Sequence, residues 1–185
     1  MALSPQPVPE RIALDGRLCL AANRWGARRA VGLFFAAISR LGDGLFWYAL
    51  MTVLALVGGA RGVTAALQMA LTGVVALILY RTLKRWTQRP RPYRGCAGVI
   101  ARVPPLDEFS FPSGHTLHAV SFSVVALAWF PLLAPLLLTF TLLVAASRVV
   151  LGLHYPSDVL AAIAIGLLLG GAALILGPAP AWSGF

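Results

Sequence analysis

Four stretches of the chain are apolar almost without interruption, at residues 45–60, 64–80, 113–153 and 159–176. Apolar residues make up 59% of the 185 and charged residues 11%, less than half of the charged share usual in soluble domains. Runs of this length are typical of membrane spans. The longest run allows two crossings of about 20 residues, joined near Pro131 and Pro135. The sequence therefore predicts an all-α fold: an integral membrane helical bundle of five to six transmembrane helices.

The first 43 residues differ from the rest of the chain. Residues 1–10 carry three prolines and no apolar core, which favours a tail. Residues 11–40 mix apolar residues with arginines, and their longest apolar stretch, 30–38, is short for a span. We interpret this part as an amphipathic interfacial segment, and its crossing would supply the sixth span. The predicted organisation is thus a tail and interfacial segment over residues 1–43, a transmembrane domain over 44–176 and a C-terminal tail over 177–185.

Small residues and cysteines bear on packing and partners. Gly166 and Gly170 form a GxxxG pair, which lets another helix approach closely. We favour packing inside the bundle, where other helices are available, and a homo-oligomer is the alternative. Cys19 and Cys96 lie far apart, outside any CxxC or metal-ligand spacing. They are predicted to be unpaired, with no metal site.

Three short polar clusters interrupt the apolar runs where the predicted spans meet water. They are Lys84 with Arg91-Pro92, the tetrapeptide at residues 112–115, and Ser147-Arg148 followed by His154 and Asp158. If successive spans alternate in direction, the ends of the second and fourth spans share a membrane face with the starts of the third and fifth. The sequence therefore predicts one site, at one membrane face, built from all three clusters.

The cations and the helix start in these clusters suit a phosphate group. Lys84, Arg91 and Arg148 bring three positive charges, and guanidinium groups bind phosphate oxygens in bidentate fashion. Ser113 and Gly114 follow a proline that suits the first turn of a helix, where free N–H groups bind anions. Residues 81–111, rich in Arg and Pro, are predicted to form a long polar loop outside the hydrocarbon. The other charges of this loop are interpreted as topology signals or as solvated loop charges: Arg85, Arg89, Arg94, Arg102, Asp107 and Glu108.

Two histidines are the candidate catalytic groups. Asp158 follows His154 by four residues, so its carboxylate can fix one ring nitrogen and leave the other as a nucleophile. His115 can donate a proton to a leaving alkoxide and then activate water. His118, one helical turn further on, is interpreted as a packing histidine.

The clusters K-x6-R-P, PSGH and SR-x5-H-x3-D resemble the signature of the type 2 phosphatidic acid phosphatases, membrane lipid phosphatases related in their active site to vanadium haloperoxidases. The resemblance covers residues 44–176. It implies hydrolysis of a lipid phosphate without metal or cofactor, through a phosphohistidine. On this resemblance His154 matches the nucleophile, Asp158 its orienting partner and His115 the general acid. The phosphate-binding residues it implies are Lys84, Arg91, Ser113, Gly114 and Arg148.

The motifs do not distinguish between several lipid substrates. We favour undecaprenyl diphosphate, with phosphatidylglycerol phosphate or phosphatidic acid as the alternative. A haloperoxidase-like protein, a non-catalytic lipid-binding protein and a transferase with an acceptor other than water are more remote. Nucleic acid is not an expected partner despite the sequence pI of about 11.1, because the cations flank membrane spans and no nucleic-acid motif is present.

The facing of the site also stays open. The resemblance implies a multi-pass protein of the plasma (inner) membrane, with the site on the periplasmic or extracellular face. If residues 1–43 lie on the side of the site, 14 of the 15 Lys and Arg residues share that side. The positive-inside rule would then favour the cytoplasm. We favour the periplasmic or extracellular face that the resemblance implies. Several of these cations are predicted to bind substrate, so they say less about topology.

Overall fold

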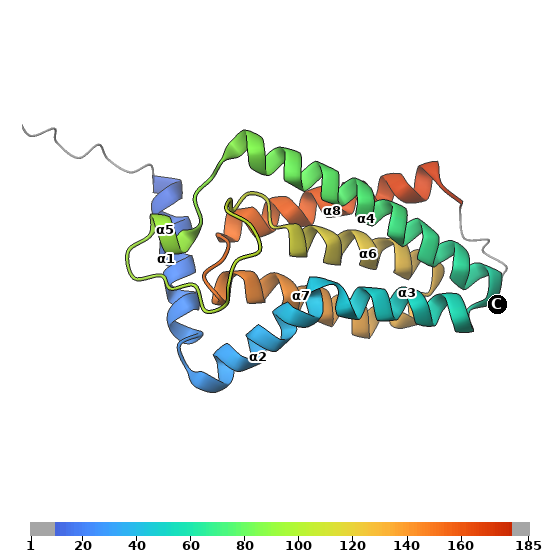
Figure 1. The fold of residues 1–185 in the computed structure, drawn as a ribbon, viewed down its shortest axis with the longest axis horizontal. Helices are drawn as coiled ribbons and strands as arrows, with labels where there is room; N and C mark the ends of the chain where they lie inside the picture. Colours follow the sequence, from blue (N-terminus) through green and yellow to red (C-terminus); the bar gives the residue numbers. More distant parts are fainter. Residues whose placement is uncertain (1–9, 179–185) are drawn as a thin grey trace, which may run out of the picture.

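The computed structural model of the chain describes residues 10–178, and every regular element in that range is helical (Figure 1). The elements are α1 Glu10–Trp25, α2 Arg29–Arg40, a π-helical turn Leu41–Leu45, α3 Phe46–Val57, α4 Gly59–Thr87, α5 Pro92–Gly95, α6 Gly114–Trp129, a 3-10 turn Pro131–Leu133, α7 Ala134–Val150 and α8 Pro156–Leu176. Nearly all of the two predicted tails lies outside the described residues. The all-α bundle is as predicted.

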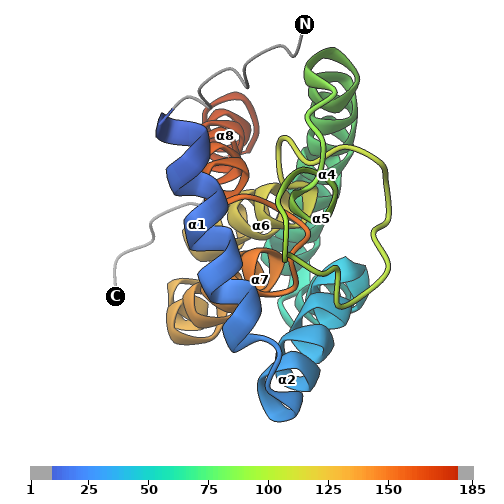
Figure 2. The ribbon, with the colours of Figure 1, turned by 90° about the vertical axis from the view of Figure 1, so that its left-hand side faces the viewer.

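Helix α6 lies in the middle of the bundle. It packs against α4, α7 and α8, which run along the same long axis (Figures 1 and 2). Leu117 and Val125 of α6 are fully buried. At its middle, Phe122 meets Trp47 of α3 with ring centroids 5.4 Å apart, and Trp47 in turn meets Phe140 of α7. Apolar packing around α6 therefore holds the long helices together.

Four helical stretches among the described residues are long and apolar enough to cross a membrane: Arg29–Val57, Gly59–Gly95, Pro131–Val150 and Pro156–Leu176. The sequence predicted five to six, so the count was slightly too high. The difference lies in α6, whose 16 residues rise about 24 Å, less than the roughly 30 Å of a bilayer core. Because α6 is surrounded by other helices, it does not have to match the thickness of the lipid.

Residues 30–38 lie in α2, and their interfacial position stays a prediction. Helix α2 continues through the turn Leu41–Leu45 into α3, so that one helical stretch, Arg29–Val57, runs through both. Gly44 in this turn has a φ of 132°, which glycine adopts readily because it lacks a Cβ. The helix therefore bends without ending, and the bend places Asp43 against the bundle.

Helix α1 lies across one end of the bundle (Figure 2). Its side chains at four-residue spacing, Asp15, Cys19 and Asn23, are buried against the bundle. The amide nitrogen of Asn23 donates to the carbonyl oxygens of Ile100 at 2.9 Å and Val150 at 3.1 Å. Hydrogen bonds thus fasten α1 over the end of the molecule where the polar clusters meet.

Helix α4 extends further than expected. The sequence predicted a polar loop over residues 81–111, but α4 continues to Thr87 and ends at Gln88, whose φ of 45° is left-handed. The loop therefore begins at Gln88. As a result Arg81 and Lys84 stand on a rigid helix rather than on a loop.

The glycine pair packs inside the molecule, as predicted. A Cβ on Gly166 would lie 2.8 Å from Cβ of Val120, and one on Gly170 would lie 2.7 Å from Cβ of Val124. The pair therefore brings α8 close to α6. Cys19 and Cys96 are both free, again as predicted.

Candidate active site

Four helix ends meet at the end of the bundle that α1 covers: the end of α4, the start of α6, the end of α7 and the start of α8. A cavity of about 1040 Å³ opens there. Six of the eight predicted site residues line it: Lys84, Arg91, Gly114, His115, Arg148 and His154. The other two, Ser113 and Asp158, are buried and do not line the cavity.

Two buried guanidinium groups stand beside His154. Arg91 donates from Nη1 to the carbonyl oxygen of Leu153 at 2.8 Å, and the same nitrogen lies 3.4 Å from Nε2 of His154. Arg148 donates from Nη1 to the hydroxyl of Ser39, while its Nε has no hydrogen-bond partner within the described residues. Burial of an ionised group without full pairing is costly, which favours an anionic ligand at this place.

Asp107 occupies part of the cation cluster, which corrects its interpretation as a solvated loop charge. Its Oδ1 accepts hydrogen bonds from Nζ of Lys84 and from Nη2 of Arg91, both at 2.7 Å. Partial burial raises the pKa of Asp107, but the hydrogen bonds and charges of these two cations outweigh it and hold the pKa below the ordinary 3.8. An ionised carboxylate thus sits where a phosphate oxygen would be held.

His154 and Asp158 lie side by side, as their spacing predicted. Nδ1 of His154 is 3.6 Å from Oδ2 of Asp158, and this oxygen also accepts the backbone N–H of Tyr155 at 2.9 Å. Burial, together with the charges of Arg148 and Arg91, holds the pKa of His154 well below its ordinary value of 6.5. The imidazole is therefore neutral near pH 7, with Nε2 on the side of Arg91.

Arg89 holds Asp158 from the other side, which corrects its interpretation as a topology signal. Its Nη1 donates to Oδ1 of Asp158 at 2.6 Å, and its Nη2 donates to Oδ2 of Asp15 at 2.7 Å. The guanidinium also stacks over the ring of Tyr155, with Cζ 4.2 Å from the centroid. The carboxylate beside His154 is therefore tied to α1 through one arginine.

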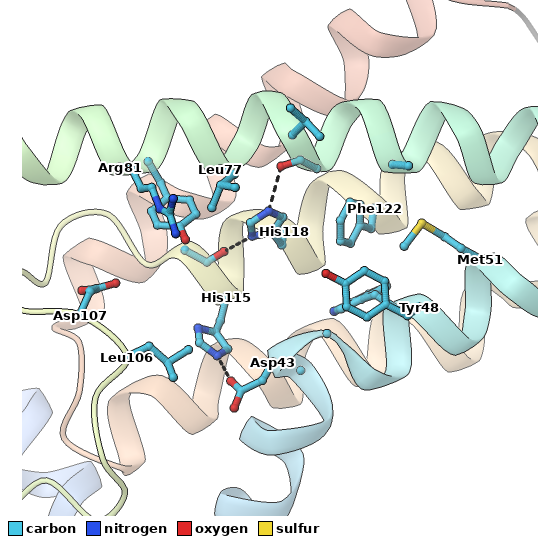
Figure 3. Close-up of a pocket in the computed structure, with 18 of the residues that line it drawn as sticks. Asp43, Tyr48, Met51, Leu77, Arg81, Leu106, Asp107, His115, His118 and Phe122 are labelled. Carbon is cyan, nitrogen blue, oxygen red and sulfur yellow. Dashed lines mark hydrogen bonds and ion pairs between the residues drawn. The ribbon is translucent and has the colours of Figure 1, made fainter.

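Asp43, which sequence reasoning missed, pairs with His115. Its Oδ1 contacts Nε2 of His115 across the cavity (Figure 3). It stands in the bend between α2 and α3, 72 positions before His115 in the chain. The carboxylate favours the protonated imidazole, but burial and the charge of Arg148 outweigh it and lower the pKa of His115 to about 4. The negative charge of a bound phosphate would raise this pKa again. The signal available in the sequence was an acidic residue between two glycines at the edge of an apolar run.

The start of α6 carries two of the predicted phosphate-binding residues, Ser113 and Gly114. The N–H of Ser113 donates to the carbonyl oxygen of Asp158 at 3.3 Å, and its hydroxyl pairs with that of Thr116 at 2.9 Å. Ser113 therefore joins α6 to α8, and its role in binding phosphate stays a prediction. Gly114 does line the cavity, and a Cβ there would stand 3.3 Å from the ring of Tyr80.

His118 packs between α6 and α4, as interpreted. Its two ring nitrogens lie 3.0 Å and 3.2 Å from the carbonyl oxygens of Gly114 and Gly73, and its ring stands against Phe122 (Figure 3).

Beyond His115 and His154 the cavity continues as an apolar groove between α3 and α4. We define the apolar groove by its lining residues Tyr48, Met51, Val63, Leu67, Val74 and Leu77. The two helices touch at Gly62, where a Cβ would lie 1.8 Å from the carbonyl oxygen of Leu54. They diverge from this contact toward Asp43 and Lys84. The polar part of the cavity, around the cations and histidines, is thus continuous with the apolar groove.

Metal ligands are not gathered at this site. Within residues 10–178 no group of three or more His, Cys, Asp or Glu side chains could hold a metal ion.

The sequence of residues 61–180, more than half of the chain, matches the PAP2 superfamily. The chain therefore belongs to this family, that of the type 2 phosphatidic acid phosphatases, as its three motifs indicated.

Individual relatives agree with this assignment. The chain is 30% identical over 115 residues to the undecaprenyl-diphosphatase BcrC of Bacillus subtilis, covering 62% of this chain and 59% of that protein. It is 33% identical over 103 residues to phosphatidylglycerophosphatase B of the same organism, covering 50% of this chain and 48% of that protein. The chain thus matches only about half to three fifths of the length of these curated relatives.

Solved structures show the same fold. LpxE of Aquifex aeolicus superimposes with a TM-score of 0.77 at 26% identity, over 91% of this chain and 99% of that one. A PAP2-type phosphatidylglycerolphosphate phosphatase from Bacillus subtilis superimposes with a TM-score of 0.72 at 24% identity, over 91% and 87%. Together with its membrane-length helices, this makes the chain a multi-pass membrane protein.

Proposed function

We propose that this protein is a lipid phosphatase that hydrolyses a lipid diphosphate, with undecaprenyl diphosphate as the favoured substrate, through a phosphohistidine on His154. One observation carries the proposal: a neutral buried imidazole faces a cluster of three cations in a cavity that continues as the apolar groove. The polar part suits a phosphate group, and the groove suits the beginning of a lipid tail.

The reaction divides between the two histidines. Nε2 of His154 attacks the terminal phosphorus, and the bond from phosphorus to the bridging oxygen breaks as the nitrogen–phosphorus bond forms. Lys84, Arg91 and Arg148 neutralise charge on the phosphoryl oxygens, which is the main contribution a protein makes to phosphoryl transfer. His115, held by Asp43, gives its proton to the leaving oxygen.

A second displacement completes the cycle. His115, now neutral, takes a proton from a water molecule, and the resulting hydroxide attacks the phosphohistidine. Free phosphate leaves and His154 regains its lone pair. Asp107 must leave Lys84 and Arg91 before the substrate phosphate takes its place, because one carboxylate oxygen accepts from both cations.

Phosphate release tests the proposal. Undecaprenyl diphosphate and phosphatidylglycerol phosphate are supplied in parallel in detergent with EDTA, to wild type and to His154→Ala. We expect release without metal from the diphosphate, lost in the variant, with an unchanged unfolding midpoint showing that the variant is folded.

The ratio of the two rates selects the substrate. Faster release from phosphatidylglycerol phosphate would favour the second candidate, which the match to phosphatidylglycerophosphatase B supports. Activity retained in His154→Ala would overturn the assignment of the nucleophile. No release from either lipid would overturn the proposed hydrolysis.

A further inference from the structure

Helix α4 carries one more cation on the wall of the cavity, at a position that the proposed reaction does not use. Arg81 stands one turn before Lys84 and one turn after Leu77, and all three line the cavity. With a rise of about 1.5 Å per residue, Arg81 lies roughly 4.5 Å along the helix from Lys84 and roughly 6 Å from Leu77. Figure 3 shows its side chain entering the cavity beside Leu77.

Arg81 differs from the paired cations of the site. Lys84, Arg89 and Arg91 each pair with a carboxylate, whereas Arg81, like Arg85 and Arg148, makes no ion pair with any residue in the described range 10–178. A cation on a helix of membrane-spanning length is unfavourable unless an anion or water compensates it. Its place between the cation cluster and the apolar groove favours an anionic part of the ligand as the partner.

The wall of α4 thus presents three kinds of surface in a fixed order. Lys84 belongs to the cation cluster, Arg81 adds a second positive charge, and Leu77 and Val74 begin the apolar groove. A lipid diphosphate has three parts in the same order: a terminal phosphate, a second phosphate and an apolar tail. A simple lipid phosphomonoester has no group for the middle position.

We propose that Arg81 binds the second phosphate of a lipid diphosphate and so selects diphosphates over phosphomonoesters, an inference that rests on the proposed phosphatase function. During attack by His154 the bridging oxygen leaves with the second phosphate, and negative charge grows on that group. A guanidinium beside it stabilises the leaving group as well as the bound substrate.

Two substrates with the same tail isolate this effect. Farnesyl diphosphate and farnesyl monophosphate differ by one phosphate, and kcat/KM is measured for both with wild type, Arg81→Ala and Arg81→Lys. We expect Arg81→Ala to lower kcat/KM for the diphosphate about 10- to 100-fold, the range for losing a charge-assisted hydrogen bond. The monophosphate should change less than about threefold, and Arg81→Lys should recover part of the loss.

Arg85 provides the matched control. It lines the same cavity and carries the same charge, but it lies on the other side of Lys84, away from the apolar groove. Arg85→Ala should leave the ratio of diphosphate to monophosphate kcat/KM at the wild-type value.

The outcomes separate the two proposals. An equal loss on both substrates, or an unchanged ratio in folded Arg81→Ala, would overturn the role of Arg81 while leaving the phosphatase intact. A ratio that falls as far in Arg85→Ala would show a general effect of charge and overturn it too. No turnover of either substrate by wild type would overturn the proposed function together with this assignment.

Discussion

The guanidinium of Arg89 donates to the carboxylate of Asp158 at 2.6 Å, and with its other terminal nitrogen it holds Asp15 of α1 at 2.7 Å. Asp158 is fully buried, and the side chain of Arg89 is 26% exposed. The carboxylate beside His154 is therefore itself positioned by a residue on the edge of the site. Through Asp15, the position of α1 bears on the geometry of the proposed nucleophile.

Removing Arg89 should slow the reaction. We expect Arg89→Ala to lower kcat about 10- to 100-fold, the usual effect of losing a partner that fixes a functional imidazole, and Arg89→Lys to lose less. Loss of the positive charge also leaves Asp158 less compensated, so the pKa of His154 should rise and the acid limb of the pH–rate profile should move to higher pH. Arg94→Ala, which removes an exposed ion pair with Glu108, is the control. An unmoved acid limb would contradict the coupling.

Neutralising Asp107 should open the phosphate position. Asp107→Asn frees Lys84 and Arg91 from a competing carboxylate, so inhibition by vanadate or inorganic phosphate should tighten about 10-fold. Because the pKa of Asp107 lies below 3.8, the competition is present at every pH above about 4. Inhibition constants for wild type and variant at pH 7 measure the effect, with Glu108→Gln as the neighbouring control. Weaker inhibition in Asp107→Asn would mean that the carboxylate organises the two cations rather than competing for them.

The loss of activity on removing the Asp43 carboxylate should depend on whether the leaving group needs a proton. Without its carboxylate His115 is a weaker acid catalyst, so Asp43→Asn should lower kcat/KM about 100-fold for a lipid phosphomonoester, whose alkoxide needs protonation. p-Nitrophenyl phosphate, whose phenolate leaves without a proton, should be affected much less. Equal losses on the two substrates would indicate that Asp43 acts only on the shape of the site.

The depressed pKa of His154 predicts activity on the acid side of neutrality. Protonation removes the nucleophilic lone pair, and a pKa well below 6.5 postpones this loss to lower pH. The acid limb of kcat/KM, which reports groups of the free protein, should therefore lie below pH 6.5, so activity is retained as the pH falls from 8 to 6.5. Profiles recorded with two substrates of different phosphate pKa separate the enzyme group from the substrate. A common limb at or above pH 6.5 would contradict the prediction.

The close contact of α8 with α6 predicts a contrast between two glycines of one helix. A Cβ on Gly166 would meet Cβ of Val120 at 2.8 Å and the carbonyl oxygen of Leu117 at 3.0 Å, whereas a Cβ on Gly171 would meet nothing within 4 Å. Gly166→Ala should therefore destabilise the fold by about 1–3 kcal/mol, and Gly171→Ala should leave it unchanged or slightly stabilised. Unfolding midpoints in detergent compare the two, and equal midpoints would refute the packing.

The sequence predicted the meeting of the clusters because alternating spans leave few choices for where their ends lie. Lys84 of α4, His115 of α6 and His154 of the segment between α7 and α8 come together for that reason alone. The count of spans was less accurate, because a central helix such as α6 is surrounded by protein and escapes the length that lipid imposes.

Motif spacing could not predict that Asp43, Arg89 and Asp107 would contact the site residues. Asp43 pairs across 72 positions and Arg89 across 69, so each contact depends on how the chain bends between elements. The small number of acidic residues was the usable signal in the sequence. The chain has only six acidic residues, and five of them gather at the end of the bundle that holds the site: Asp15, Asp43, Asp107, Glu108 and Asp158. In a chain built for lipid, each costly charge needs a partner.

The side of the apolar groove that faces away from the bundle has a consequence for kinetics. Tyr48, Val63 and Leu67 line the groove and remain exposed, so its flank opens toward the surrounding lipid. A substrate can slide in sideways while its tail stays among the acyl chains. Under the proposed function, the protein then senses the mole fraction of substrate in one leaflet, encounters it by two-dimensional diffusion, and slows when inert lipid is added at constant bulk concentration.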